Sequence, residues 1–471
     1  MAKKRLHTSC LITCLLTVTL LMCFDTYVRA CPIANDSKVL EDHPTIQVRK
    51  RATFALRSLL KIDWSVYHGY LEIEEILISL NKTFPEIVDI FPIGKSWGNK
   101  TIYCARLTNE NKVFRKPKIF FVGYHHAREP ISAELPLYFL VYATENYGSN
   151  ATITRMLDLC EIYVVAALNV DGFDIIESND WQRKNAHPID EDEDGYIEYL
   201  WNASSNRIIR WEGIDDDSDG RLNEDWIGGV DLNRNYYYAW NTPADSGSTD
   251  PYAEDYRGPE PFSEPETKAM KDLALEHDFK YAISFHSGAE VILYPWGHTH
   301  NKTSDDYVFT EVAADLAETI GVPYEQSSEM YTTSGVWDDW MYGNRNIIAL
   351  TCEIFNNSSA WLVEPGPELH TFWIGGILQV FNPVPNNIQS VLSKWLPVFT
   401  YIINKAIGSH IPGDLNGDGV VNILDISIVA QAFGTKPGDL KWNTIADVDN
   451  NGVVNIIDIA LVAKCFGRTR D

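Results

Sequence analysis

A histidine and a glutamate three residues apart follow a short apolar run. Residues 118–134 read KIFFVGYHHAREPISAE, and the β-type run 119–122 ends in a polar turn that holds His126 and Glu129. An imidazole nitrogen and a carboxylate at this spacing can reach one Zn²⁺ from the same side. A polar turn between a strand and a helix also carries such a pair by chance, so the motif gains meaning only with further ligands.

Two later residues supply what a hydrolytic zinc site would still need, which is a third protein ligand and a base near an open water position. Among the 12 histidines, His286 ends a clean apolar run in YAISFHSGAEVILYPWG. Glu353 interrupts another in IIALTCEIFN, where a carboxylate is costly to bury unless it is paired, ligating or catalytic. As a general base it would take the proton of the attacking water. A structural ion pair is the alternative.

Strand-like and helix-like runs alternate through the middle of the chain. This alternation predicts an α/β fold, with a mixed, mostly parallel sheet flanked by helices, and parallel strand ends meet at one edge of such a sheet. The expected strands are 102–107, 119–122, 162–168, 281–285 and 347–354, and the expected helices are 67–85, 131–146, 264–277, 304–320 and a closing helix 388–406 that contains Pro397.

Composition and the N-terminal residues indicate which partners to exclude and where the protein is located. A formal net charge of −26 over 471 residues argues against a nucleic-acid partner. Residues 1–30 combine basic residues, a short apolar run and a small-residue cleavage site, which predicts a signal peptide and a secreted or cell-surface protein. A membrane anchor and a lipid-anchored Cys31 are the alternatives, and no later stretch is expected to span a membrane. The segment 31–62 is too short to form a folded inhibitory pro-domain.

The C-terminal part, 413–471, follows a short linker at 408–412 and contains an internal repeat. GDLNGDGVVNILDISIVAQAFG is followed by ADVDNNGVVNIIDIALVAKCFG, and each copy has the spacing of a calcium-binding loop. The expected ligands are Asp414, Asn416, Asp418, Val420 and Asp425 in the first loop, and Asp447, Asp449, Asn451, Val453 and Asp458 in the second. The repeat therefore predicts two Ca²⁺ ions in a small all-α domain.

This repeat resembles the dockerin module over residues 413–467. The resemblance implies two bound Ca²⁺ ions and docking onto a cohesin domain of a scaffold protein. Apolar Ile423, Leu424, Ile456 and Ile457 fall where many dockerins carry polar recognition residues, which favours a hydrophobic docking surface. A calcium-stabilised terminal module without a partner is the alternative.

The motifs of residues 64–407 resemble those of the zinc metallocarboxypeptidases of the A/B family, and most closely the carboxypeptidase T-like members. They occur in the expected order as His126-Ala-Arg-Glu129, Asn233-Arg234, His286-Ser287, Tyr331 and Glu353. The resemblance places a catalytic domain at 63–407 and implies one catalytic Zn²⁺. It implies three zinc ligands, His126, Glu129 and His286, and Glu353 as the general base. Arg128 would polarise the scissile carbonyl. Asn233 and Arg234 would clamp the terminal carboxylate of a peptide or protein substrate, and Tyr331 would close over the substrate as a lid.

The chain departs from this family at one expected arginine. The family has a Trp-Arg-Lys-x-Arg run, whereas WQRKNAH has Arg183 and Lys184 but Ala186 at the last position. Either Arg183 substitutes, or Arg128 suffices, or turnover is reduced. Asp338 matches the family's position at the floor of the specificity pocket, which implies a preference for C-terminal Lys or Arg, alone or mixed with apolar residues. The alternative is a side chain that points to solvent.

An acidic insert, IDEDEDGYIE and then IDDDSDGRLNED, lies between residues 188 and 231. It copies calcium-loop spacing twice but lacks an acid at position twelve, so further Ca²⁺ at 190–225 and a solvated loop are both open.

Two other functions compete with a carboxypeptidase. One is a cell-wall peptidase of the same fold that cleaves muropeptides, and the other is a non-catalytic, calcium-dependent scaffold protein.

Overall fold

The computed structural model describes most of the chain from residue 61 onward. The described residues are 61–112, 115–176, 182–187, 199–202, 207–211, 228–251, 253–357, 378–408, 413–416, 420–443, 445–449 and 451–469. The expected signal peptide, Cys31, nearly all of the segment 31–62 and the linker after residue 408 lie outside them, as does most of the acidic insert. Within the described part of the chain, no helix combines the length and apolar character that a membrane span requires.

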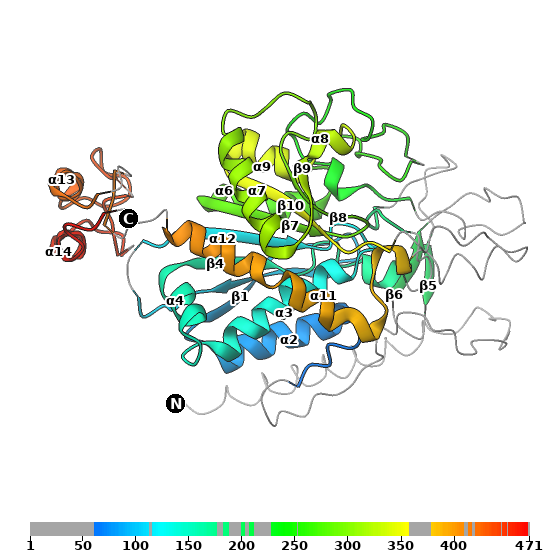
Figure 1. Ribbon diagram of the computed structural model, residues 1–471, viewed down its shortest axis with the longest axis horizontal. Helices are drawn as coiled ribbons and strands as arrows, with labels where there is room; N and C mark the ends of the chain where they lie inside the picture. The colour runs from blue at the N-terminus through cyan, green and yellow to red at the C-terminus, as the bar shows by residue number, and fades with distance from the viewer. Residues whose placement is uncertain are drawn as a thin grey trace, which may run out of the picture. The chain divides into compact units, whose positions relative to one another are not determined.

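A mixed sheet forms the centre of this structure (Figure 1). Its strand order is β1-β2-β4-β3-β7-β10-β8-β9. The strands are β1 (Val88–Lys95), β2 (Thr101–Leu107), β3 (Lys118–Gly123), β4 (Glu161–Val165), β7 (Phe279–His286), β8 (Glu290–Tyr294), β9 (Tyr324–Gln326) and β10 (Ile348–Ile354). The central strands β4, β3, β7 and β10 are parallel, whereas β1, β2 and β8 each pair antiparallel with a neighbour. The predicted sheet is therefore confirmed. A separate two-stranded ribbon, β5 (Tyr199–Asn202) with β6 (Arg207–Trp211), lies in the acidic insert.

Helices cover both faces of the sheet (Figure 1). One face packs against α2 (Tyr70–Thr83), α3 (Ile131–Asn146) and α12 (Pro397–Gly408), and the other against α6 (Pro265–Glu276) and α9 (Trp337–Arg345). The remaining elements are α4 (Ala151–Leu159), α5 (Gly172–Ile175), α7 (Asp306–Ile320), α8 (Ser327–Met330), α11 (Ile388–Trp395) and the 3-10 turns η1 (Leu232–Arg234) and η3 (Pro385–Asn387).

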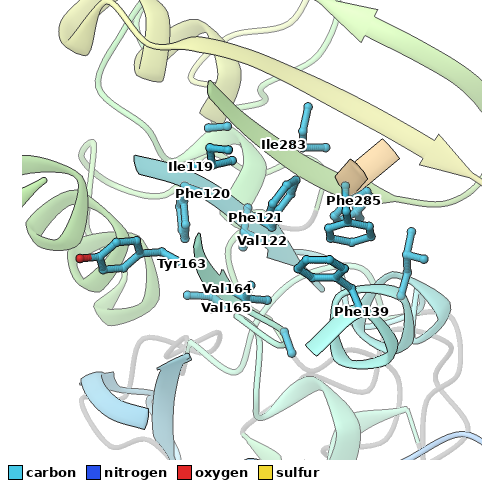
Figure 2. Packing of buried hydrophobic residues seen from close by; sticks show 14 of the residues in the cluster. Ile119, Phe120, Phe121, Val122, Phe139, Tyr163, Val164, Val165, Ile283 and Phe285 are labelled. Carbon is cyan, nitrogen blue, oxygen red and sulfur yellow. The ribbon is translucent and has the colours of Figure 1, made fainter. Parts of the chain in front are cut away.

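Aromatic residues on both faces fix the central strands in place. On the α3 and α12 face, the ring of Phe399 lies 4.1 Å from that of Phe139 and 4.6 Å from that of Phe121, measured between centroids. On the opposite face, Phe120 contacts Trp337 of α9. Figure 2 shows Phe120 and Phe121 on opposite sides of β3, as expected for successive strand residues. Because both faces of β3 are buried, its register and the position of the turn after it are fixed.

The closing segment forms two helices, so the prediction of a single helix over 388–406 was wrong. α11 ends at Trp395 and α12 begins at Pro397. Proline has no N–H to donate inside a helix and its ring collides with the carbonyl four residues earlier, whereas the first helical position tolerates it. The chain therefore breaks before Pro397 and starts a new helix there.

The C-terminal repeat forms two short helices, α13 (Ile423–Ala432) and α14 (Ile456–Lys464). Each begins at an asparagine cap and a reciprocal capping box, with Asp425 as the partner of Asn422 and Asp458 as the partner of Asn455. The buried residues of this region form their own cluster, which includes Val421, Val429, Val454 and Val462. The all-α repeat is confirmed.

Candidate metal centre and substrate cavity

Three predicted ligands meet at the carboxyl edge of the central strands. His126 and Glu129 lie in the turn after β3, and His286 is the last residue of the adjacent parallel strand β7. All three are buried, and their ligand atoms lie within 4.8 Å of one another. His126 Nδ1 is 2.8 Å from Glu129 Oε1, and His286 Nδ1 is 3.2 Å from Glu129 Oε2 and 3.1 Å from His126 Nδ1. Two imidazole nitrogens and a carboxylate thus converge on one point.

The second nitrogen of each imidazole contacts a side chain on the side of the ring away from the converging ligand atoms. Nε2 of His126 lies 3.2 Å from Asp231 Oδ1, and Nε2 of His286 lies 3.0 Å from Ser284 Oγ. If Nδ1 of His126 binds a metal ion, Nε2 would carry the proton and donate to Asp231, because an ionised carboxylate only accepts. Histidines that bind metals are oriented in this way, and a set of two imidazoles and one carboxylate suits Zn²⁺. The residues present therefore fit a zinc ion.

The charge states of these residues also suit a cation. Burial alone would raise the pKa of Glu129, but His126 and His286 lower it well below its usual range, so the carboxylate is anionic. Burial lowers the pKa of His286 to about 4, so its imidazole is neutral and can offer a lone pair. The backbone N–H of Ser287 donates to Glu129 Oε2 at 3.1 Å and holds the carboxylate in place.

His125 has a different position from its neighbour. Its Nε2 lies 3.1 Å from the hydroxyl of Tyr236, and its Nδ1 lies 3.2 Å from Ser284 Oγ. Burial lowers its pKa well below the usual range, so the ring is neutral. His125 is outside the group of converging ligand atoms. It contacts Ser284, whose hydroxyl in turn contacts His286.

A cavity of about 280 Å³ opens in front of the three ligands. Glu353 of β10 lines it, opposite His286 in the parallel register. The side chain is partly exposed to the cavity, but the dense surroundings raise its pKa to about 8, chiefly by desolvation and then through the charge of Glu129. Its Oε2 atom has no hydrogen-bond partner among the described residues. Such a carboxylate can exchange a proton near neutral pH.

Arg183 and Arg128 line the same cavity and contact different partners. Nε of Arg183 donates to Asp231 Oδ2 at 2.8 Å, and its Nη1 lies 3.9 Å from Glu129 Oε1. Nη1 of Arg128 lies 3.0 Å from a carboxylate oxygen of Glu254, and the guanidinium stacks over Phe381 at 4.5 Å. Ala186, where an arginine was expected, is buried beside Ile175 and is not part of the cavity lining.

Asp231 joins the metal site to Arg183, and the sequence analysis missed it. It is fully buried, and its two oxygens accept from Arg183 Nε, His126 Nε2 and the backbone N–H of Asn233. Burial would raise its pKa, but the charges of Arg183 and Arg234 lower it well below the usual range. The available signal was an acid directly before the Leu-Asn-Arg motif.

The clamp residues lie on η1 at the cavity wall. Nε of Arg234 donates to Ser246 Oγ at 3.0 Å, and its Nη1 donates to the backbone carbonyl of Asn233 at 2.7 Å. The side-chain oxygen of Asn233 accepts from the backbone N–H of Trp337 at 2.9 Å. Tyr331 is 44% exposed at the rim, and Asp338, on the first turn of α9, is buried at the wall.

The second predicted calcium loop brings three carboxylates together. Oxygens of Asp447, Asp449 and Asp458 lie within 4.8 Å of one another. Burial raises the pKa of Asp447, and the charges of Asp458 and Asp449 add to this effect. Asn451 and Val453 lie on the same loop, and Asn451 N–H donates to Asp447.

In the first loop, Asp425 Oδ1 accepts from the backbone N–H groups of Leu415 and Asn416 at 2.8 and 3.1 Å. Oδ1 of Asp414 is buried in the same loop. Val420 pairs in an isolated bridge with Thr469. Asp418 and the acidic runs at 190–198 and 212–225 lie outside the described residues.

Comparisons with known proteins agree with both parts of the chain. Residues 73–390 match the zinc carboxypeptidase family, and residues 412–466 match the dockerin type I domain. Carboxypeptidase B of Astacus astacus is 29% identical over 318 residues, which cover 65% of this chain and 92% of that protein. Human mast cell carboxypeptidase A is 28% identical over 288 residues, which cover 59% of this chain and 60% of that protein.

Solved structures show the same fold. Bovine thrombin-activatable fibrinolysis inhibitor, solved in complex with tick carboxypeptidase inhibitor, aligns with a TM-score of 0.56 at 22% identity, covering 73% of this chain and 98% of that chain. Carboxypeptidase A from Helicoverpa armigera aligns with a TM-score of 0.56 at 18% identity, covering 75% and 76%. The chain therefore belongs to the zinc carboxypeptidase family, with a dockerin type I domain at residues 412–466.

Proposed function

We propose that this protein removes C-terminal amino acids from peptides, with one Zn²⁺ held by His126, Glu129 and His286. The observation that carries the proposal is their convergence at one end of a cavity that Glu353 and Arg234 also line. A bound zinc ion would polarise the scissile carbonyl and make the attacking water more acidic. The residues of the chain would then move the proton and hold the substrate.

Glu353 is the proposed general base. Its unpartnered Oε2 and raised pKa suit a group that takes a proton from water and then passes it to the departing amine. Arg183 is the proposed donor to the carbonyl oxygen, because it lies beside Glu129 and Asp231 fixes its Nε. Arg128, which pairs with Glu254, lines the same cavity and would share this role.

The clamp explains why the proposed cleavage is restricted to chain ends. Within the described part of the chain, Arg234 donates through its Nε and one Nη1 hydrogen, and a guanidinium has about five N–H groups. The others are free to bind the terminal carboxylate of a substrate as a fork, assisted by Asn233. Tyr331 would close over the bound residue, and Asp338 would face its side chain and favour Lys or Arg.

The dockerin domain is the proposed attachment point. With two Ca²⁺ bound, it would dock onto a cohesin domain of a scaffold protein, so that the exported enzyme works at a cell surface or in an extracellular assembly. The exposed side chains of Ile423, Leu424, Ile456 and Ile457 support an apolar docking surface. Each pair lies at the start of a helix, α13 or α14.

Turnover of hippuryl-Lys and hippuryl-Phe, measured with zinc stoichiometry, tests the catalytic proposal. The purified protein should release the C-terminal residue, lose activity with a chelator and regain it with about one equivalent of zinc. Glu353→Gln should retain zinc and lose about 10²–10⁴-fold in kcat. Full activity of that variant would overturn the assignment of the base, and a zinc-loaded protein inactive on both substrates would favour the non-catalytic alternative. Release from muropeptides alone would favour the cell-wall peptidase.

A further inference from the structure

Asp338 is a buried acid in the substrate cavity with little to balance its charge. It is 4% exposed and lies in the first turn of α9. Its Oδ1 accepts from the backbone N–H of Asp339 at 3.1 Å, and its Oδ2 accepts from Thr351 Oγ1 at a long 3.4 Å. Among the described residues it has no ion-pair partner.

The adjacent acid, Asp339, differs from Asp338 in the number of hydrogen-bonding groups that contact its carboxylate. Asp339 is fully buried but accepts from the backbone N–H groups of Gly297 and His298, at 2.8 and 3.0 Å. Its Oδ2 also lies 2.6 Å from Nδ1 of His298. Two backbone N–H groups and one imidazole nitrogen thus contact Asp339. Burial and the charge of Asp339 together raise the pKa of Asp338 to about 7.

Other charged groups around the cavity are engaged elsewhere. Arg234 of η1 is bonded to Ser246 and to a backbone carbonyl. Glu353 of β10 and His286 of β7 lie at the metal end of the cavity, and Tyr331 lies at its rim. The acid that α6 contributes, Glu266, bonds to Asn185. None of these groups forms an ion pair with Asp338.

We propose that Asp338 makes the substrate preference of this enzyme dependent on pH, accepting apolar C-terminal residues when neutral and Lys or Arg when ionised. The inference rests on the proposed carboxypeptidase function and adds a protonation switch to it. A neutral carboxyl group can lie beside an apolar side chain at modest cost, whereas an unpaired buried carboxylate cannot. An incoming Lys or Arg supplies the missing counter-charge, so it selects the ionised form.

The sign and size of the effect follow from the titration. Below the pKa the neutral form dominates and apolar residues are preferred; above it the ionised form dominates and basic residues are preferred. The ratio of ionised to neutral carboxyl changes about tenfold per pH unit. The ratio of kcat/KM for a basic substrate to that for an apolar one should rise by up to about tenfold per unit near pH 7. Ionisations common to both substrates, including that of Glu353, cancel in this ratio.

The test measures kcat/KM of the zinc-loaded full chain for hippuryl-Arg and hippuryl-Leu from pH 5.5 to 8.5. A third substrate, hippuryl-citrulline, controls for size because it is a neutral near-isostere of the arginine substrate. The Arg-to-Leu and Arg-to-citrulline ratios should both rise with pH and level off above the pKa. Ratios that stay constant across the range would overturn the proposal.

Variants then assign the switch to one carboxyl group. Asp338→Asn should flatten the ratio and fix it at its low-pH value, and Thr351→Val, which removes a donor, should move the inflection to higher pH. Glu329→Gln is the matched control, because it removes one exposed negative charge on α8 near the rim and should leave the profile unchanged. A pH-dependent ratio that persists in Asp338→Asn would overturn the assignment. Hydrolysis of both substrates at a constant ratio refutes the switch alone, whereas absence of zinc-dependent hydrolysis refutes the proposed function.

Discussion

Asp231→Asn is the most informative single substitution at the metal centre. The carboxylate of Asp231 accepts from His126 Nε2 at 3.2 Å and from Arg183 Nε at 2.8 Å. Asparagine preserves the size of the side chain but replaces one acceptor oxygen with an NH₂ group. That donor would face the donor of either His126 or Arg183, so one of the two contacts must be lost.

The two possible losses have different magnitudes and different readouts. If the contact with His126 is lost, the imidazole is oriented less well, and zinc affinity should fall about 10–100-fold, or about 1.4–2.8 kcal/mol. If the contact with Arg183 is lost, the proposed carbonyl donor moves. At saturating zinc, kcat should then fall about 10²–10³-fold. We expect both effects, because the substitution also removes the charge that holds both partners.

Chelator competition measures the zinc affinity. Separately, kcat at saturating zinc measures the effect of losing the contact with Arg183. Asp158→Asn provides a control, because this α4 carboxylate also accepts two side-chain bonds, from Asn109 and Tyr147, away from the cavity. The control should keep both values. If Asp231→Asn binds zinc as tightly as the unchanged protein and retains its kcat, Asp231 does not orient the site and the reasoning is refuted.

Three further predictions follow from other contacts. Arg234→Lys should raise KM for free peptides by about 10–100-fold and reduce discrimination against C-terminal amides, since a lysine cannot form the fork; unchanged discrimination in paired kinetics would contradict the clamp. His68→Gln should lower stability by about 1–2 kcal/mol at pH 5.5 and by less at pH 9. Burial alone would lower the pKa of His68, but Glu134, 2.9 Å away, raises it, so the contribution is complete below about pH 6.5 and is lost through the raised pKa. Equal melting-temperature differences at both pH values would exclude that linkage. Asp458→Ala should abolish calcium binding by the second loop without changing kcat/KM; calorimetry checks this, with Asp439→Ala, outside the loops, as the control.

Much of the candidate zinc centre could be predicted from the sequence because its polar residues lie within, at the end of, or shortly after an apolar run. His126 follows β3, His286 is the last residue of β7, and Glu353 is a charged residue within β10. The physical cost of burying such groups makes them visible in a single sequence. The expected strand 119–122 also falls within β3, because apolar runs of that length in an alternating pattern favour a buried parallel strand.

Other features depend on contacts between segments far apart in the sequence. The double role of Asp231 requires the turn after β3 and the segment around Arg183 to reach one carboxylate, and no local pattern indicates this. Motif spacing predicts an arginine at position 186, whereas the structure brings Arg183 to the cavity and buries Ala186. The pairing of Arg128 with Glu254 likewise arises only from the fold.

The carboxyl groups of the site fall into two classes, and the difference lies in the number of positive or donating neighbours. Glu129 and Asp231 each contact imidazoles, and an arginine lies against Asp231, so their pKa values fall despite burial. Glu353 and Asp338 are also desolvated, but fewer hydrogen-bond donors contact them. Desolvation therefore dominates, and their pKa values rise. Groups that hold a cation or orient a ligand must remain ionised, whereas a proton carrier or a switch must titrate near the working pH. One buried cavity can therefore contain both kinds of acid, because the folded chain distributes its few donors unequally among them.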